Sequence, residues 1–346
     1  MIATTPLLGY LGQSENVVKL ATPYYLIASI SLIPSMLFVG SKQLIEGTGL
    51  TKPSMNASIV FNILNIILNY LLIYGNYGFP RLELEGAAWA TLISRIGMGV
   101  SLFVYIMYSK KFKIYRSYKL NRFLSISHIQ KILTIGFPIS LQFLLEVASF
   151  SFGAIMSGWI NPESLAAHQV ALSIAAFTYL AASGIASAAT IRISHLNGEK
   201  KILELKKSAI SSYLLVLVWM SFCAILMVIF RFPLAELFVT EIDVIKISAT
   251  LLIIAAVFQL FDGLQVTSLG ILRGLEDVKL PTIIAMISYW LISLPVGYAL
   301  GILFRMGVAG VWLGFLVGLI SAASLLFLRY LKFIKKLSVK KTVVGI

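Results

Sequence analysis

The stretch IKISATLLIIAAVFQLFDGLQVTSLGIL (245–272) indicates the fold of this chain most clearly. Between Ile247 and Leu272 its only charged residue is Asp262. A run of roughly 20 predominantly apolar residues is long enough, as a helix, to cross the ~30 Å hydrocarbon core of a bilayer. The stretch therefore predicts a membrane-spanning helix that carries one acidic side chain near its middle.

The same pattern recurs along the whole chain. Backbone polar groups have no partners in lipid, so such runs form helices, and short alternating segments typical of a β-barrel are absent from the sequence. We therefore predict an all-α, polytopic membrane helix bundle with nine transmembrane helices. The predicted spans are 20–44, 54–75, 86–108, 132–158, 165–191, 208–230, 245–272, 281–303 and 308–330.

The composition excludes several other classes of protein. Of 346 residues, 59% are hydrophobic and 12% are charged, whereas soluble domains carry about 25% charged residues. The net charge of +14 does not predict a nucleic-acid partner, because the basic residues lie in short loops between apolar runs. No nucleophile elbow, zinc-protease motif or phosphate loop occurs, so we do not expect an enzyme, and no cofactor is implied.

The distribution of Lys and Arg predicts the orientation, because cytoplasmic loops retain basic residues. The segment 109–130 and the C-terminal tail are rich in them, and the loops near Lys42, Lys200 and Arg273/Lys279 fall on the same side. We therefore expect the C-terminus to be cytoplasmic and the N-terminus to face outward. Arg95 lies within a predicted span, and five basic residues would face outward: Lys19, Arg81, Arg231, Lys246 and Arg305.

An internal repeat relates the two ends of the chain. Pro6–Gly47 aligns with Pro233–Gly274 without a gap. Chance similarity between apolar segments is the alternative, although matches of Pro, Gly and Lys at helix ends are harder to obtain by chance. The matched pairs include Pro6/Pro233, Lys19/Lys246, Ser41/Ser268 and Gly47/Gly274.

The repeat predicts two lobes, an arrangement common among transporters. We expect a truncated N-terminal lobe of three helices (1–108), a basic cytoplasmic linker between the lobes (109–130) and a C-terminal lobe of six helices (131–346). Comparing the lobes, about 95 residues, or roughly three helices, would be missing before Met1, which gives nine helices out of an expected twelve.

Only two acidic residues, Glu146 and Asp262, fall deep within predicted spans. A charge near the bilayer centre costs about 2.5–3.5 kcal/mol, so such residues usually face a bundle interior or a wet cavity. We predict that both couple transport to a cation or proton, binding Na⁺ or exchanging H⁺; the alternative is that they only join helices. Gln142, Gln259 and Gln265 lie within one turn of these carboxyls and are expected to line the same cavity.

The first lobe carries a smaller polar group. Asn62, Asn65 and Asn69 share one helix face, and Thr91 lies in the next predicted span. Asn65, Asn69 and Thr91 are expected to line the cavity, with interhelical hydrogen bonding as the alternative. Arg95 is a possible charge partner, whose counter-charge would then lie in the missing segment.

Several motifs in series resemble the multidrug and toxic compound extrusion (MATE) family, and specifically its NorM-like branch. They cover nearly the whole chain. In order, they include EGTGLTKPSM (46–55), LNIILNYLLIYG (64–75), GFPISLQFLLEVASF (136–150), FDGLQVTSLGILRGLED (261–277) and SYWLISLPVGYALG (288–301).

The resemblance implies a monomeric secondary transporter in a bacterial inner membrane. It would exchange amphipathic, often cationic drugs for Na⁺ or H⁺ by alternating access, with Glu146 and Asp262 as the cation site. Its partners would be such small molecules and membrane lipid. Two alternatives stay open: a flippase for lipid-linked saccharides, which needs several Arg or Lys in its cavity, and a non-functional, N-terminally truncated remnant.

Overall fold

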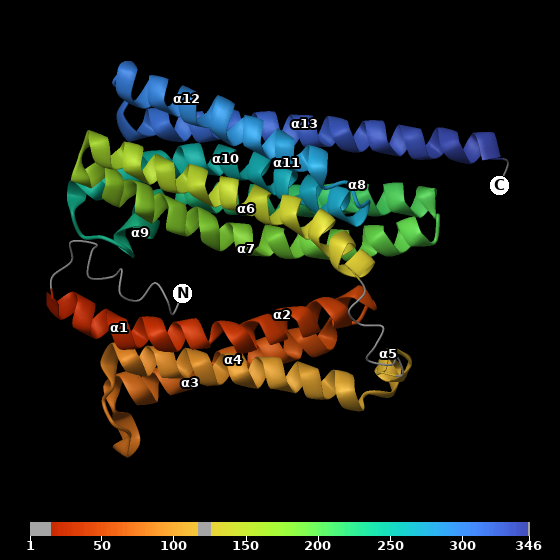
Figure 1. Ribbon diagram of the computed structural model, residues 1–346. Coiled ribbons are helices and arrows are strands. Elements are labelled where there is room, and N and C mark those ends of the chain that lie inside the picture. Colours follow the sequence, from red (N-terminus) through yellow and green to blue (C-terminus); the bar gives the residue numbers. More distant parts are fainter. Residues whose placement is uncertain (1–14, 117–125, 345–346) are drawn as a thin grey trace. The chain divides into compact units, whose positions relative to one another are not determined.

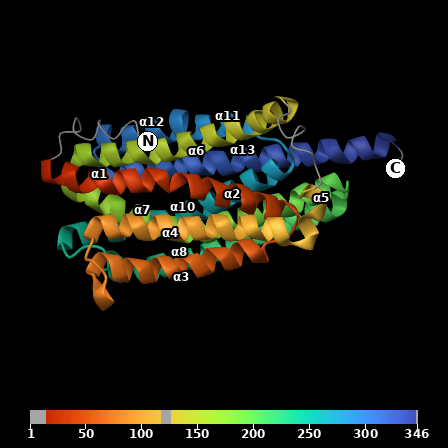
Figure 2. The ribbon, with the colours of Figure 1, turned by 60° about the horizontal axis from the view of Figure 1, so that its bottom comes forward.

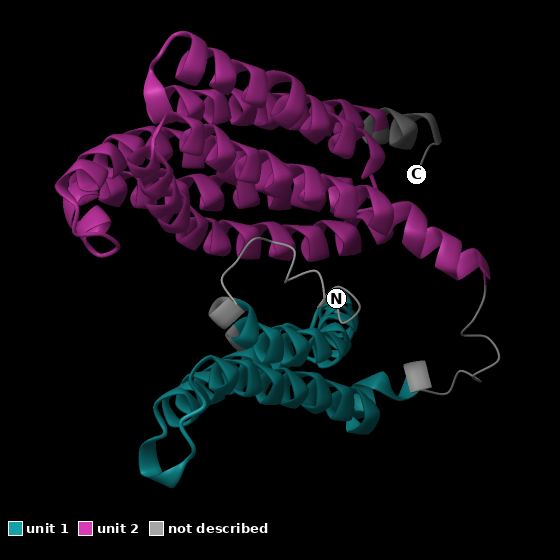
Figure 3. Ribbon diagram, turned by 60° about the vertical axis from the view of Figure 1, so that its left-hand side comes forward, with its two compact units in different colours: residues 1–124 teal, residues 125–346 magenta. Residues whose placement is uncertain are grey.

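The computed structural model describes residues 15–116 and 126–344, and the described chain is helical (Figure 1). It contains two compact units, residues 1–124 and residues 125–346 (Figure 3). Each unit has its own buried apolar side chains.

Within the described ranges, nine helical segments are long and apolar enough to cross a membrane, which confirms the predicted all-α membrane fold. Most are longer than predicted, because the helices continue beyond the apolar core. The nine segments are Ala21–Gly47, Lys52–Tyr74, Glu83–Tyr108, Ile126–Ile160, Pro162–Gly198, Ile202–Ile229, Ile242–Gly274, Lys279–Leu303 and Gly307–Lys336.

The first unit places α3 beside α4, as both views show (Figures 1 and 2). The helices pack closely at Gly86, where a Cβ atom would lie 2.6 Å from the carbonyl oxygen of Leu72. The elements of the first unit are α1 (Glu15–Ile30), α2 (Leu32–Gly47), α3 (Lys52–Tyr74), η2 (Asn76–Gly78), α4 (Glu83–Tyr108), η3 (Lys110–Phe112) and α5 (Lys113–Arg116).

The second unit is built around α10, which is buried at positions along its whole length, from Val244 to Gly274. Helices α7, α8 and α13 pack against it. The elements are α6 (Ile126–Ile160), α7 (Pro162–Gly198), α8 (Ile202–Ile229), α9 (Arg231–Glu236), α10 (Ile242–Gly274), α11 (Lys279–Met286), η5 (Ile287–Ser293), α12 (Leu294–Tyr298), η6 (Ala299–Leu303) and α13 (Gly307–Val344).

Small residues bring α7 and α10 into close contact. A Cβ atom on Gly270 would lie 2.4 Å from the carbonyl oxygen of Ala186, and one on Gly274 would lie 2.8 Å from that of Thr190. The Thr190 hydroxyl also donates to the carbonyl oxygen of Gly270 at 2.8 Å. Gly270 and Gly274 are four residues apart, as are Ala186 and Thr190, which is the spacing that lets membrane helices approach closely.

The predicted span 281–303 is not a regular α-helix. Its segments η5 and η6 are π-helical and flank the short helix α12, which contains Pro295. Proline lacks the N–H that an α-turn needs, and π-turns are frequent at functional sites. The irregular stretch includes Tyr289, whose contacts are described below.

Two sequence predictions need qualification. Arg273, assigned to a loop by its charge, lies in the last turn of α10, because that helix extends to Gly274. The start of the repeat at Pro6, and residues 117–125 of the linker, lie outside the described residues. The repeat and the lobe boundaries stay predictions.

The α7–α10 contact makes the stability of the second unit sensitive to one methyl group. We expect Gly270→Ala to cost about 1–3 kcal/mol, because the added Cβ pushes the two helices apart. A lower thermal unfolding midpoint of the detergent-solubilised protein would show this. The control is Gly184→Ala on α7, where a Cβ atom meets nothing within 4 Å; equal midpoints for the two variants would contradict the close packing.

Candidate functional site

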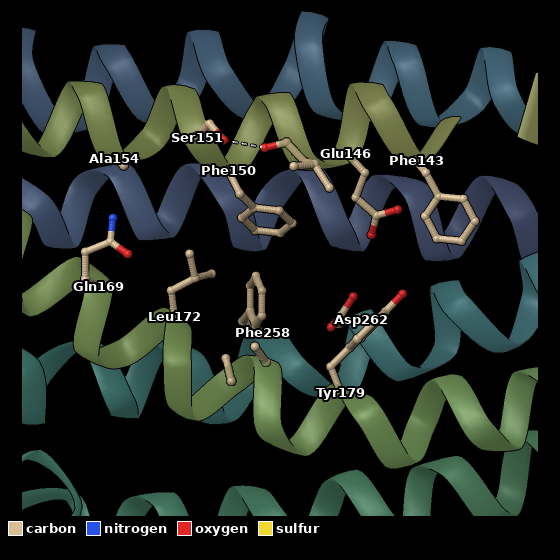
Figure 4. Close-up of a pocket in the computed structure, with 13 residues that line it drawn as sticks. Phe143, Glu146, Phe150, Ser151, Ala154, Gln169, Leu172, Tyr179, Phe258 and Asp262 are labelled. Atoms are coloured by element: carbon tan, nitrogen blue, oxygen red, sulfur yellow. Dashed lines mark hydrogen bonds between the residues drawn. The ribbon is translucent and has the colours of Figure 1, made fainter. Parts of the chain in front are cut away.

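A cavity of about 640 Å³ opens among α6, α7 and α10 in the second unit. Glu146 of α6 and Asp262 of α10 project into it from opposite walls, although 116 positions separate them in the sequence (Figure 4). The structure therefore brings the two intramembrane carboxyls to one cavity.

The remaining walls of the cavity are largely apolar and aromatic. Phe150 and Phe258 meet edge to face, with ring centroids 6.2 Å apart. Tyr179 of α7 reaches toward the carboxyl of Asp262 (Figure 4). We call the residues that line the cavity its wall residues: Phe143, Glu146, Val147, Phe150, Ser151, Ala154, Gln169, Leu172, Ala175, Ala176, Tyr179, Phe258 and Asp262.

Glu146 is 8% exposed and contacts Tyr289 from the π-helical segment η5. The Tyr289 hydroxyl lies 3.1 Å from Oε1 of Glu146 and 2.7 Å from Oε1 of Gln265. A phenol carries one hydrogen and can donate it to only one of two acceptors. A protonated Glu146 would satisfy both contacts by donating to Tyr289, which then donates to Gln265. The alternative is a turned amide of Gln265, which would donate to Tyr289.

Asp262 is also buried, at 6% exposed. Among the ion pairs of the described residues, none includes Asp262 or Glu146. Two carboxyls in one cavity that lack an ion-pair partner among the described residues can take up a proton or a cation.

The three predicted glutamines lie beside the carboxyls but outside the set of wall residues. Gln259 is held between helices: its Oε1 accepts from Thr178 at 2.9 Å, and its Nε2 donates to the carbonyl oxygen of Met220 at 3.1 Å. Gln265 contacts Tyr289, and Gln142 contacts Arg273. Their assignment as cavity-lining groups stays a prediction.

Sequence reasoning missed Tyr289 and Arg273. Arg273 follows Asp262 by eleven positions, just over three full turns of 3.6 residues, so the two share a face of α10. That spacing was a usable signal. Tyr289 gave none, because its position depends on the π-helical turns of η5.

In the first unit, Asn65, Asn69 and Thr91 bond within their own helices, whereas Arg95 bonds across helices. The Asn69 amide donates to Oδ1 of Asn65 at 3.0 Å on α3. The Thr91 hydroxyl donates to the carbonyl oxygen of Ala87 in its own helix, α4. Arg95 donates from Nη1 to the Ser31 hydroxyl at 2.6 Å, at the break between α1 and α2. Whether these residues form part of a transport site stays a prediction.

Comparisons with known proteins agree with this architecture. A sequence profile described as MatE matches residues 1–71 and 138–299. The chain is 30% identical, over 335 residues, to the probable multidrug resistance protein NorM of Agrobacterium fabrum, covering 95% of this chain and 72% of that protein. It is 33% identical, over 337 residues, to the multidrug resistance protein NorM of Vibrio vulnificus, covering 95% of this chain and 73% of that protein.

Solved structures show the same fold. An outward-facing multidrug resistance MATE family transporter of the MOP superfamily superposes with a TM-score of 0.88 at 20% identity, over 97% of this chain and 74% of that one. The Vibrio cholerae MATE transporter VcmN in its bent form superposes with a TM-score of 0.83 at 23% identity, over 98% and 75% of the two chains.

The fold and the site together define a multi-pass integral membrane protein with a carboxylate-containing cavity inside a helical bundle. The profile match and the relatives at 30–33% identity then give the family. The chain belongs to the MATE family of multidrug efflux transporters, which are not enzymes, and the two NorM relatives place it with the NorM proteins.

The Tyr289 contacts generate a test of the site. We expect Tyr289→Phe to lower stability by about 1–3 kcal/mol, because it removes the hydroxyl from two buried polar partners. The thermal unfolding midpoint should fall, while Tyr298→Phe, at a 42%-exposed position on the same span, should leave it unchanged. If both variants unfold at the wild-type temperature, the hydroxyl of Tyr289 does not hold the site together.

Proposed function

We propose that this chain exports amphipathic, cationic compounds in exchange for inward movement of Na⁺ or H⁺. One observation carries the proposal: Glu146 and Asp262, two carboxyls deep within the spans, line the same aromatic cavity. An exchanger needs a site where cargo and coupling ion exclude each other, and shared carboxyls provide one.

The cavity walls favour a flat, positively charged cargo. Aromatic faces attract cations by about 0.5–2 kcal/mol, more when water is excluded. Phe143, Phe150, Phe258 and Tyr179 are wall residues, and the carboxyls add a second source of attraction. The names of the NorM relatives, as multidrug resistance proteins, support a permissive cavity of this kind.

The contacts of Glu146 favour a role in coupling. The hydrogen bonds among Glu146, Tyr289 and Gln265 can include one additional proton on Glu146. Loss of that proton leaves a carboxylate that can bind a cation. Cargo and coupling ion would each favour a different arrangement of the helices, so binding of one promotes release of the other. For Na⁺, the oxygens of Glu146, Asp262 and Tyr289 are the candidate ligands.

Further features of the proposal rest on the sequence. The two lobes would be 1–108 and 131–346, joined by the basic linker 109–130, with the C-terminus cytoplasmic. The protein would act as a monomer in a bacterial inner membrane. The first-lobe residues Asn65, Asn69, Thr91 and Arg95 would contribute a second polar cluster.

The wall residues argue against the alternative of a flippase for lipid-linked saccharides. Such a protein would hold a pyrophosphate with Arg or Lys side chains. The described wall of this cavity contains acidic, apolar and aromatic residues but neither Arg nor Lys.

The proposal predicts that neutral amides at the two carboxyls abolish exchange. The full chain, reconstituted in proteoliposomes with an imposed Na⁺ or H⁺ gradient, should lose nearly all gradient-driven efflux of a fluorescent aromatic cation in Glu146→Gln and in Asp262→Asn. Glu163→Gln, an exposed acid in the first turn of α7, is the matched control and should retain wild-type efflux. Gradient-driven efflux that persists in both amide variants would refute the assignment.

A further inference from the structure

Arg273 brings a positive charge close to the cavity from the end of α10. It lies in the last turn of that helix, on the same face as Asp262 and about 16 Å along the axis from it, at 1.5 Å per residue. A charged side chain within a membrane-spanning helix rarely lacks a specific partner. The contacts of Arg273 therefore indicate what the charge does.

The guanidinium of Arg273 is held against α6 by two neighbouring residues. Its Nη2 donates to Oε1 of Gln142 at 3.1 Å. Its Cζ lies 4.8 Å from the ring centroid of Phe143, within the range of a cation–π interaction. Phe143 is a wall residue of the cavity, so the guanidinium lies directly behind one part of the wall.

Gln142 separates this cation from the carboxyl of Glu146. The two residues lie one turn apart on α6 and are both buried. Arg273 and Glu146 interact electrostatically, but no ion pair joins them in the described part of the chain. Instead, the neutral amide oxygen of Gln142 accepts a hydrogen bond from the guanidinium. Nε of Arg273 and Nε2 of Gln142 are both buried without a hydrogen-bond partner.

This arrangement leaves the carboxyl available to another cation while keeping a positive charge nearby. Two carboxyls among four aromatic rings would hold an organic cation strongly. A transporter must also release its cargo, so tight binding alone would stop the cycle. A fixed positive charge a few ångströms beyond the wall weakens the attraction without blocking the cavity.

We propose that Arg273 is a built-in counter-cation that competes with cationic cargo for Glu146 and thereby limits how tightly the cavity holds it. Gln142 is the spacer that keeps Arg273 from pairing with the carboxyl. The inference rests on the proposed function, because it takes the cargo to be a cation bound by Glu146. Arg273 is a positioning residue: it acts on the cargo through the charge of Glu146.

A purely structural role is the competing explanation, since Arg273 also links α10 to α6. Charge and packing can be separated by substitution. Arg273→Lys keeps the positive charge but loses the planar group that contacts Phe143. Arg273→Gln keeps a polar side chain and removes the charge. Gln142→Met keeps the size of the spacer and removes the amide oxygen that holds the guanidinium.

The test measures equilibrium binding and does not depend on transport. The full chain in lipid nanodiscs is titrated at constant pH and ionic strength with tetraphenylphosphonium, an aromatic monocation, and with triphenylphosphine oxide, a neutral compound of related shape. We expect Arg273→Gln to bind tetraphenylphosphonium about tenfold more tightly, which corresponds to removing one nearby like charge. Arg273→Lys should stay within about twofold of wild type.

Gln142→Met should have the opposite effect. Once the amide oxygen that holds the guanidinium is lost, Arg273 is free to pair with Glu146, so binding of tetraphenylphosphonium should weaken several-fold. Binding of the neutral compound should not change in any of the three variants, because the competition is between charges. This second variant keeps the proposal testable if Arg273→Gln fails to fold.

The outcomes separate this inference from the proposed function. If Glu146→Gln weakens binding of the cation but Arg273→Gln does not tighten it, the counter-cation role is wrong and the cation site stands. If both probes shift alike in Arg273→Gln and Arg273→Lys, the residue is structural, and the proposal is overturned. If Glu146→Gln leaves cation binding unchanged, the cation site itself is rejected, and the role of Arg273 with it.

Discussion

The membrane-spanning helices are surrounded by lipid instead of water, and this limits where their polar groups can lie. In hydrocarbon, a polar group must find its partner inside the bundle or face a cavity that admits solvent. The N–H and C=O groups of a helical backbone bond to each other, so the constraint applies to the side chains. Helix α10 illustrates the result. Gln259 is bonded to α7 and α8, Gln265 is bonded to η5, and Asp262, between them, faces the cavity.

The close packing of α7 on α10 keeps that arrangement in place. Where Gly270 and Gly274 meet Ala186 and Thr190, the two backbones are in direct contact, and such contacts leave little freedom for one helix to slide along the other. Tyr179 and Asp262, which are wall residues from these two helices, therefore belong to one firm surface. Glu146 comes from α6 on the opposite wall, so a movement of α6 would change the distance between the carboxyls.

The sequence predicted the fold well because the signal is repeated and strong. Each span is a long apolar run, and helix is the conformation that such runs adopt in lipid. Glu146 and Asp262 could be found for the same reason, as rare charges within apolar runs. Arg273 was misplaced because a basic residue near the end of an apolar run resembles a loop residue, and charge counting cannot tell whether the helix continues past it. Tyr289 could not be found, since a tyrosine in an apolar run is common and its partners come from α6 and α10.

The π-helical turns on both sides of α12 have a consequence for how this span can move. A π-turn contains one residue more than an α-turn, so η5 and η6 hold extra length inside this span. Passing that surplus residue from one wide turn to the other would rotate the intervening α12 by about 100° while the ends stay in place. A span built in this way can reorient its middle section, α12, without unwinding.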